Sequence, residues 1–576
     1  MTETVQTIDQ EALAPDGAAV SSPAESVIPS KGAVLVPAMA SSLALAACSG
    51  GGGNSPPPIA IATPTPTPTA AAISGVQASR FLAQSTMGAT KADIALVQSM
   101  GVSGWITEQI SRPRTAHWDW LVTNGYSAPN FINNQQGFDN TVWRQIISEP
   151  GQLRQRVGMA LAEILVVGID GVNQQWRQFS VAAYLDVLLD NAFGNYRTLL
   201  EGITTNAAMG AYLTFINNRR ANATTGAMPD ENYARELMQL FTLGLNRLNM
   251  DGTLQMASGA PVDTYTQDDV TQLARVFTGL VLDSADSTTP NRLRRPLVIN
   301  AALHESGASS FLGTTIPAGT EGLAAVRLAL DAIFAHPNVP PFVSKQLIQR
   351  LVTSNPSAAY VGRVAAVFAN NGSGVRGDLT AVIRAILLDT EARSDAVLTA
   401  ASTGKLREPV IRFTNWARAY GATSTAGLWP IGNTSSSSTQ LAQSFGRSAS
   451  VFNFFRPGYT PPNTPIATAG LLAPEFQITN ELSVVAFINF MQPIIQNGIS
   501  DVRANYAEIS ALANDSAALV DEVNLVLAAG QLSATTVAAI RAAVDSIATT
   551  ATNATLNRVY TAILLTLASP EYITLK

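Results

Sequence analysis

The stretch PDENYARELMQLFTLGL, residues 229–245, shows the pattern that decides the fold. Tyr233, Leu237 and Phe241 recur four residues apart, which is the spacing of one apolar face of an α-helix. A proline opens the stretch, two acidic residues follow it, and Gly244 closes it, as expected at the two ends of a helix. The stretch therefore predicts one helix that starts at its proline.

The same helical spacing recurs along most of the chain, and long alternating runs of β-branched residues are missing from the sequence. We expect the other helices at Arg80–Gln98, Val157–Val167, Ala182–Asn191, Val270–Leu282, Leu323–Ala335, Phe342–Thr353, Ala358–Ala369, Leu379–Leu388 and Leu406–Tyr420. Thr266 and Asp269 predict a capping box at the start of one of them. The predicted fold is all-α, a large multi-helix bundle with long irregular loops at residues 284–310, 421–438 and 454–470.

Length and composition exclude several classes of protein. The chain has 576 residues and a net charge of -6, and only 13% of its residues are charged. It is too long for one small core and too apolar for bulk disorder, and its mildly acidic balance argues against nucleic-acid partners. One cysteine and three histidines exclude a disulfide scaffold and argue against a metal site, and the sequence contains none of the common nucleotide or hydrolase motifs. We therefore expect neither a metal nor a cofactor.

The single cysteine lies at the end of a signal-like segment. Residues 32–48 read GAVLVPAMASSLALAAC after Lys31, and their last four residues resemble a bacterial lipobox, in which the cysteine carries a lipid. Gly, Ser, Pro and Thr dominate residues 49–75, which suits a tether. We expect a signal region at 1–48 with lipidation at Cys48, the tether at 49–75, and a membrane contact through the lipid. The main helical body is then 76–498, and 499–576 is a C-terminal Ala-rich helical subdomain packed on it.

Residues 1–30 do not suit an ordinary signal, because they are long and carry several acidic side chains. One interpretation is that translation starts further along, near Val27, which would leave a short basic segment before the apolar run. The other is that residues 1–75 form a disordered N-terminal arm. Ser49 follows the cysteine, and by resemblance to lipoprotein sorting in Gram-negative bacteria this favours the outer membrane over other extracytoplasmic or periplasmic locations.

Eight segments in order carry a family resemblance that runs from about Arg80 to Tyr572. They are LRQRVGMALAEILVV (153–167), LLDNAFGNYRTLLEGITTNAAMGAYL (188–213), PDENYARELMQLFTLGL (229–245), TYTQDDVTQLARVFTG (264–279), HESGASSFLG (304–313), GKLREPVIRFTNWARA (404–419), SVFNFFRPGYTPP (450–462) and LLAPEFQITNELSVVAFINFM (471–491). The chain resembles the domain-of-unknown-function 1800 family of bacteria. The resemblance implies an extracytoplasmic protein, usually encoded beside a second secreted protein, and it supplies no catalytic residues.

The helix predicted at 229–245 also carries a polar stripe. Asn232, Arg235 and Glu236 share one face, and Glu231 is spaced to pair with Arg235. In a chain so poor in charge, such a stripe is either a solvated face or a functional cluster. We expect it to turn toward the segment that holds Glu163, with Glu236 buried against an arginine.

Arginines and one histidine complete the candidates. Arg154, Arg156 and Arg456 lie within apolar segments, where they either pair with glutamates such as Glu163 or form an anion or sugar-acid site. His304 stands beside an acid in a loop and is a weak candidate for a general base.

Two functions stay open from the sequence, and it does not decide whether the protein is an enzyme. The first is a binding or assembly role at the cell envelope, with a membrane and a neighbouring secreted protein as partners. The alternative is a hydrolase of envelope or polymeric material that uses carboxylates such as Glu163, Glu231 or Glu236 as acid and base.

Overall fold

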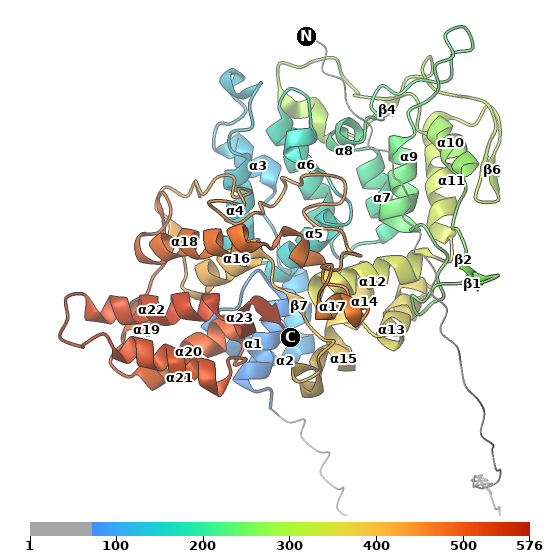
Figure 1. Cartoon of the computed structure of the whole chain (residues 1–576). Helices are drawn as coiled ribbons and strands as arrows, with labels where there is room; N and C mark the ends of the chain where they lie inside the picture. Colours follow the sequence, from blue (N-terminus) through green and yellow to red (C-terminus); the bar gives the residue numbers. More distant parts are fainter. Residues whose placement is uncertain (1–71) are drawn as a thin grey trace, which may run out of the picture. The chain divides into compact units, whose positions relative to one another are not determined.

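The computed structural model describes residues 72–576, which belong to one compact unit, Ala70–Lys576. The predicted signal region with Cys48 and nearly all of the predicted tether lie outside the described residues. The described part is predominantly helical, and its strands form only short antiparallel pairs, so the all-α prediction is confirmed (Figure 1). Among residues 72–576 no helix is long and apolar enough to cross a membrane.

The helices follow the expected segments, with shifted ends. The first half of the chain holds α1 (Gly75–Ser85), α2 (Lys91–Ser111), α3 (His117–Thr123), α4 (Phe138–Ser148), α5 (Gln152–Ala162), α6 (Arg177–Asp190), α7 (Tyr196–Thr204), α8 (Ala207–Tyr212), α9 (Asn232–Glu236) and α10 (Gln267–Val276). The second half holds α11 (Gly322–Ala335), α12 (Val339–Leu351), α13 (Ala358–Ala369), α14 (Leu379–Leu388), α15 (Thr390–Arg393), α16 (Pro409–Ala419), α17 (Pro465–Thr468), α18 (Glu481–Asn497), α19 (Ala507–Ser510), α20 (Ser516–Ala528), α21 (Ala534–Asp545), α22 (Ala554–Ala568) and α23 (Pro570–Ile573).

Short helical turns and strand pairs connect these helices. The 3-10 turns are η1 (Pro129–Phe131), η2 (Ile169–Gly171), η4 (Pro290–Arg294), η5 (Asp395–Leu398) and η6 (Pro474–Ile478), and η3 (Leu237–Thr242) is a π-helix. The strands pair as β1 (Met256–Ala257) with β2 (Ala260–Pro261), β3 (Leu280–Val281) with β4 (Val298–Ile299), β5 (Ser309–Phe311) with β6 (Thr314–Ile316), β7 (Lys405–Leu406) with β10 (Thr574–Leu575), and β8 (Thr423–Ser424) with β9 (Val502–Arg503).

One predicted helix divides in two, and another begins later than predicted. The segment expected at Arg80–Gln98 divides into α1 and α2, because Gly88 adopts a positive φ and packs so closely on Asn415 that a Cβ would lie 2.4 Å from its Cα. Thr266 and Asp269 form the predicted capping box of α10. The helix expected from Pro229 begins only at Asn232, whose amide nitrogen donates to the Asp230 carboxylate, so the predicted start is wrong.

The interior of the fold is formed by helices that are buried on nearly every side. On α6 and α16 most positions are inaccessible to solvent, including the polar ones, and such helices belong at the centre of a large helical body. α5 contacts both α6 and α12, and α5 and α12 lie side by side (Figure 1). This pairing places the end of α5 against the C-terminal end of α12, at Arg350, where the candidate site lies.

The segment after residue 498 contacts earlier parts of the chain. Its strands β9 and β10 pair with β8 and β7, and α20 packs on α1 and α16. The division of the helical body at residue 498 stays a prediction.

Candidate functional site

One face of α12 lines a cleft of about 780 Å³, which we call the α12 cleft. Phe342, Lys345, Gln346, Gln349 and Arg350 follow one another at helical spacing and all contribute to it. A cleft of this volume is typical of sites for small organic molecules.

The second wall comes from the π-helix η3 and the turn after it. In η3 the amide nitrogen of Leu243 donates to the carbonyl of Met238, five residues back, and this wider turn places Leu240 in the cleft. Gly244 has φ 76°, as predicted for a left-handed cap, and a Cβ on it would lie 2.7 Å from the Phe342 ring. Such π segments often occur at functional sites, so this interruption of a regular helix is itself a pointer.

The third wall is the irregular segment before α17. Phe452, Arg456 and Tyr459 face the cleft from this segment, and the Arg456 guanidinium stacks on the Phe452 ring at 4.8 Å from its centre. Apolar and aromatic side chains therefore surround a small number of charged groups, as in most ligand pockets.

Glu163 forms the deep end of the cleft. It caps the C-terminus of α5, and its side chain is only 3% exposed. Neither carboxyl oxygen accepts a hydrogen bond from a donor group, and the nearest cation is Arg350, whose Nε lies 3.7 Å from Oε2. A buried carboxylate without a donor is costly, so this position favours the neutral acid.

The carboxyl group of Glu408 supplies the missing partner of Glu163. Burial and the negative charge of Glu408 raise the pKa of Glu163 well above its usual range. Burial also opposes the charge on Glu408, but Lys405 and a hydrogen bond from Glu163 lower the pKa of Glu408. Glu163 therefore keeps its proton and donates a hydrogen bond to ionised Glu408.

Below the cleft, Glu408 belongs to a buried charge network. The Lys405 ammonium lies 3.0 Å from Glu475 and 3.5 Å from Glu408, and it donates to the carbonyl of Arg350 at 2.8 Å. Gln443 donates to the second oxygen of Glu408 at 2.7 Å. Five segments that are far apart in the sequence meet here, namely the end of α5, α12, the β7–α16 junction, the loop that holds Gln443, and η6. This network holds Glu163 in position at the deep end of the cleft.

The predicted arginines divide between the cleft and the core. Arg456 lines the cleft, whereas Arg156 lies fully buried beneath it and donates to the Arg350 carbonyl. Arg154 points elsewhere, since its guanidinium donates to the Leu189 carbonyl and stacks on Phe193.

The polar stripe of α9 does not join this site. Glu231 pairs with Arg235 at 3.0 Å and accepts hydrogen bonds from Gln267 and Thr271 of α10, so the stripe faces α10. Asn232 is partly exposed beside these groups.

The expectation for Glu236 is wrong. Its side chain is half-buried, and within residues 72–576 no arginine lies at ion-pair distance from it. One carboxyl oxygen is buried without a hydrogen-bond partner, and burial raises the pKa of Glu236.

His304 is buried, and its Nδ1 lies 2.8 Å from the carbonyl of Thr278. The small hollow beside it has a volume of about 10 Å³, which leaves no room for an organic ligand. This geometry suits a residue that ties a loop to the end of α10. Residues 72–576 contain no cluster of three or more His, Cys, Asp or Glu side chains that would hold a metal ion.

Sequence reasoning missed four charged members of the site, and Arg350 at the deep end of the cleft is one of them. Lys345 lines the cleft, and Lys405 and Glu475 form the network beneath it. Lys345 (in FVSKQLI) and Glu475 (in APEFQ) are lone charges among uncharged, largely apolar residues, and this is the signal that points to them, whereas Lys405 stands close to Arg407 and Glu408 in GKLRE.

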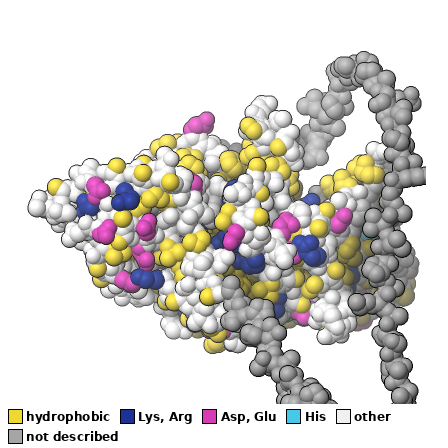
Figure 2. All heavy atoms as spheres, turned by 90° about the horizontal axis from the view of Figure 1, so that it is seen from below, with side chains coloured by type: hydrophobic (Ala, Val, Ile, Leu, Met, Phe, Trp, Pro, Cys, Tyr) yellow, Lys and Arg dark blue, Asp and Glu magenta, His cyan; other side chains and the backbone are white. Residues whose placement is uncertain are grey.

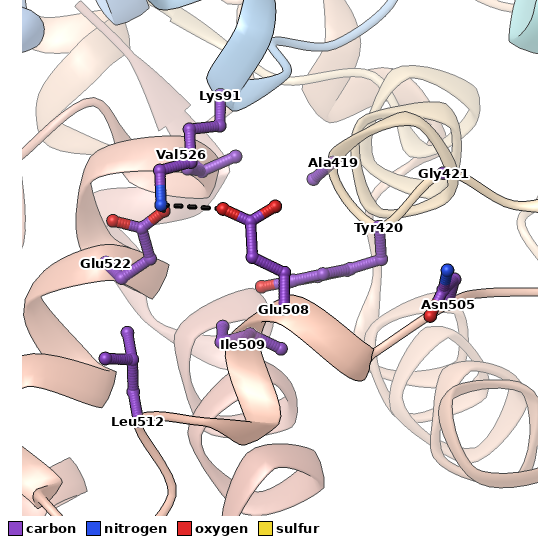
Figure 3. A pocket seen from close by; sticks show the side chains of 10 residues that line it. All are labelled: Lys91, Ala419, Tyr420, Gly421, Asn505, Glu508, Ile509, Leu512, Glu522 and Val526. Carbon is purple, nitrogen blue, oxygen red and sulfur yellow. Dashed lines mark hydrogen bonds and ion pairs between the residues drawn. The ribbon is translucent and has the colours of Figure 1, made fainter.

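A second, smaller pocket of about 280 Å³ lies between the start of α2, the end of α16 and helices α19 and α20 (Figure 3). The Lys91 ammonium stands between Glu508 and Glu522, at 2.8 and 3.2 Å (Figure 3). These charges already pair with one another, so they offer an incoming ligand little unsatisfied charge. On the face seen in Figure 2, acidic and basic side chains are interspersed, and no large area of one sign appears.

The comparison with known families covers the whole site. A family model described as "Protein of unknown function (DUF1800)" matches residues 80–574, from within α1 to the start of β10. No curated protein and no solved structure matches the chain. The α12 cleft and the network beneath it lie entirely inside the matched region.

Proposed function

The chain belongs to the DUF1800 family of proteins of unknown function, and we propose that it is an extracytoplasmic binding protein that holds a small organic ligand in the α12 cleft. The proposal rests on the combination of apolar walls with a buried carboxyl group at the deep end of the cleft. Apolar side chains such as Leu240, Phe342 and Phe452 enclose about 780 Å³, and the cleft ends on Glu163, a buried polar group without a donor partner. Convergence of a few polar groups in an apolar cleft is the usual sign of a ligand site.

Leu240→Trp tests this function, because the larger ring would fill the cleft from the η3 wall. We expect native mass spectrometry of protein purified from its own membranes to show a bound small molecule, and Leu240→Trp to lose it. Leu556→Trp is the matched control, since Leu556 is partly exposed on α22 and does not line the cleft. Equal ligand occupancy in both variants would exclude the cleft as the binding site.

The proposed location is extracytoplasmic, at the outer membrane or in the periplasm, with a lipid on Cys48. The lipobox-like segment that ends at Cys48 and the tether composition of residues 49–75 support it. Cys48→Ala is expected to move the protein from the membrane fraction to the soluble fraction. Detection of an unmodified Cys48 by mass spectrometry would contradict the lipid anchor. The partners proposed here are this membrane and, in an assembly role, the secreted protein encoded beside this one.

A hydrolase is the second candidate, and the protonated state of Glu163 favours it. A carboxylic acid that stays neutral at the end of a cleft is suited to protonate a leaving group. The test is turnover of envelope glycans or peptides. Loss of turnover in Glu163→Gln, together with full turnover in Glu231→Gln, would support catalysis over binding. A Glu163→Gln variant with full turnover would exclude this role for Glu163.

A further inference from the structure

We propose that the ligand of the α12 cleft is an organic monoanion, an apolar or aromatic body with one acid group that pairs with Lys345 and Arg456. This inference rests on the proposed binding function and names its ligand class. It follows from the charges that line the cleft and from the lack of acidic partners for two of them.

Lys345 is a cation without a partner. It projects from α12 into the cleft, it is half-buried, and no acidic group or hydrogen-bond acceptor within residues 72–576 pairs with its ammonium. Burial alone lowers the pKa of Lys345, with no carboxylate to oppose the effect. An ammonium in this position gains more from an anion than one in water does, because the surrounding apolar walls reduce screening.

Arg456 stands on the facing wall and also pairs with no acidic group in the described residues, although its side chain is more exposed than that of Lys345. Its guanidinium stacks on Phe452, and none of its side-chain nitrogens bonds to an acceptor in the described residues. Arg350 at the deep end adds a third positive charge, whereas Glu163 is the only acid among residues 72–576 that lines the cleft. With its proton in place Glu163 is neutral, so the cleft carries an excess of positive charge.

This excess decides between classes of ligand. A cationic ligand would add to charges that already lack partners, and a neutral sugar would leave Lys345 unpaired. An inorganic anion would pair with the cations but leave the apolar walls formed by Leu240, Leu248 and Phe342 in contact with water. An organic monoanion meets both requirements, since its acid group pairs with Lys345 and Arg456 and its body covers the apolar walls.

Two aromatic probes of the same shape test the charge directly. 1-Anilinonaphthalene-8-sulfonate carries an acid group, and N-phenyl-1-naphthylamine has the same rings without it. We expect both to bind the full-length protein with a rise in fluorescence and one-to-one stoichiometry, and Leu240→Trp to abolish both signals. The double variant Lys345→Met Arg456→Met is expected to weaken the sulfonate by about tenfold or more and the neutral amine by less than about threefold.

The control variant removes a positive charge that lies outside the cleft. Arg541→Met changes an exposed arginine of α21 and is expected to leave both affinities unchanged. Equal weakening of the two probes by the double variant would overturn the monoanion while the cleft remains a binding site. Probe binding that Leu240→Trp leaves intact would instead overturn the proposed function itself, so the two failures are distinguishable.

Competition separates two sources of such an anion. Displacement of the sulfonate probe by laurate would indicate a lipid-derived acid, and displacement by N-acetylphenylalanine would indicate a peptide carboxyl end. Both results support the proposal. If neither acid displaces the probe from a cleft that Leu240→Trp can close, the monoanion assignment is wrong.

Discussion

Glu163 and Glu408 lie close together in the protein interior, where the charge of Glu408 raises the pKa of Glu163, although the two residues are on different helical segments and both are buried. The two side chains have unequal surroundings. Glu408 has the Lys405 ammonium and the Gln443 amide as donors, whereas no donor reaches Glu163. The proton therefore stays on Glu163, and Glu408 carries the charge.

This asymmetry predicts opposite results for two otherwise equivalent substitutions. Glu163→Gln replaces a neutral acid by a neutral amide that can still donate to Glu408, so we expect it to change the free energy of unfolding by less than about 1 kcal/mol. Glu408→Gln removes the negative charge that faces Arg156 and leaves Lys405 with Glu475 alone, and it is expected to cost about 3–5 kcal/mol. Urea unfolding at pH 7 measures both, and equal losses would contradict a proton held on Glu163.

The same proton gives the free energy of unfolding a pH dependence. The unfolded chain releases this proton near pH 4.5, whereas the folded protein keeps it to a higher pH. Above pH 4.5 the folded state therefore binds more protons than the unfolded state. The stabilisation from this group is complete below pH 4.5 and is lost as the pH rises toward the raised pKa. Wild-type protein should therefore lose stability relative to Glu163→Gln between pH 5 and the raised pKa.

His117 predicts a pH effect of the opposite sign. Burial, with smaller effects of Arg114 and Arg144, lowers the pKa of His117 from 6.5 to about 3, and its Nδ1 lies 3.1 Å from the Thr141 hydroxyl. The unfolded state binds the proton first, so the stabilisation is complete above pH 6.5 and is lost as the pH falls toward 3. At pH 5 the wild type should have lost about 2 kcal/mol more than His117→Gln, as measured by urea unfolding at pH 7 and pH 5.

The sequence predicts the helices well and the candidate site poorly, for one physical reason. Helical periodicity is local, and at Ala358–Ala369 and Leu379–Leu388 the predicted and observed bounds coincide. The cleft and its network join Glu163, Arg350, Glu408 and Glu475, and only the packing of α5 on α12 and on the later segments brings them together. Spacing along the chain contains no information on such a meeting.

The π-helix marks a second limit of sequence reasoning. Residues 237–242 have the same apolar spacing as an ordinary helix, so the pattern predicts no change of hydrogen bonding there. The wider turn depends on the tertiary contacts of η3 with α11 and α12. Its effect is functional, since it places Leu240 in the cleft, and it also makes Gly244 necessary beside Phe342.

Glu236 gives a prediction that reverses the expectation from its sequence. Because it has no ion pair to lose and one of its oxygens is buried without a partner, Glu236→Gln should change the free energy of unfolding by less than about 1 kcal/mol. Glu231→Gln is the contrast variant, since Glu231 accepts from Thr271, Gln267 and Arg235. Thermal melting of both variants measures the difference. A larger loss of stability in Glu236→Gln than in Glu231→Gln would indicate that Glu236 does form a buried ion pair.

Two arginines with the same geometry and different exposure supply the last prediction. Arg447 binds the carboxylate of Asp139 through two nitrogens at 2.7 and 2.8 Å, reaches Asp170 at 3.0 Å, and is 4% exposed. Arg363 binds Asp389 through two nitrogens at 2.8 Å and is 49% exposed.

Lysine keeps the charge at each position and removes the two-nitrogen contact, so the pair of substitutions compares a buried arginine that also reaches Asp170 with a half-exposed one that has a single carboxylate partner. Arg447→Lys should cost about 1.5–3 kcal/mol, because hydrogen bonds to a buried charge are lost and water cannot replace them. Arg363→Lys should cost less than about 1 kcal/mol, as usual for an exposed pair. Arg447 anchors the segment that continues to Phe452 and Arg456, so its variant should also weaken binding of the sulfonate probe. Urea unfolding and probe titration measure the two effects, and equal costs for the two variants would show that burial of Arg447 contributes nothing.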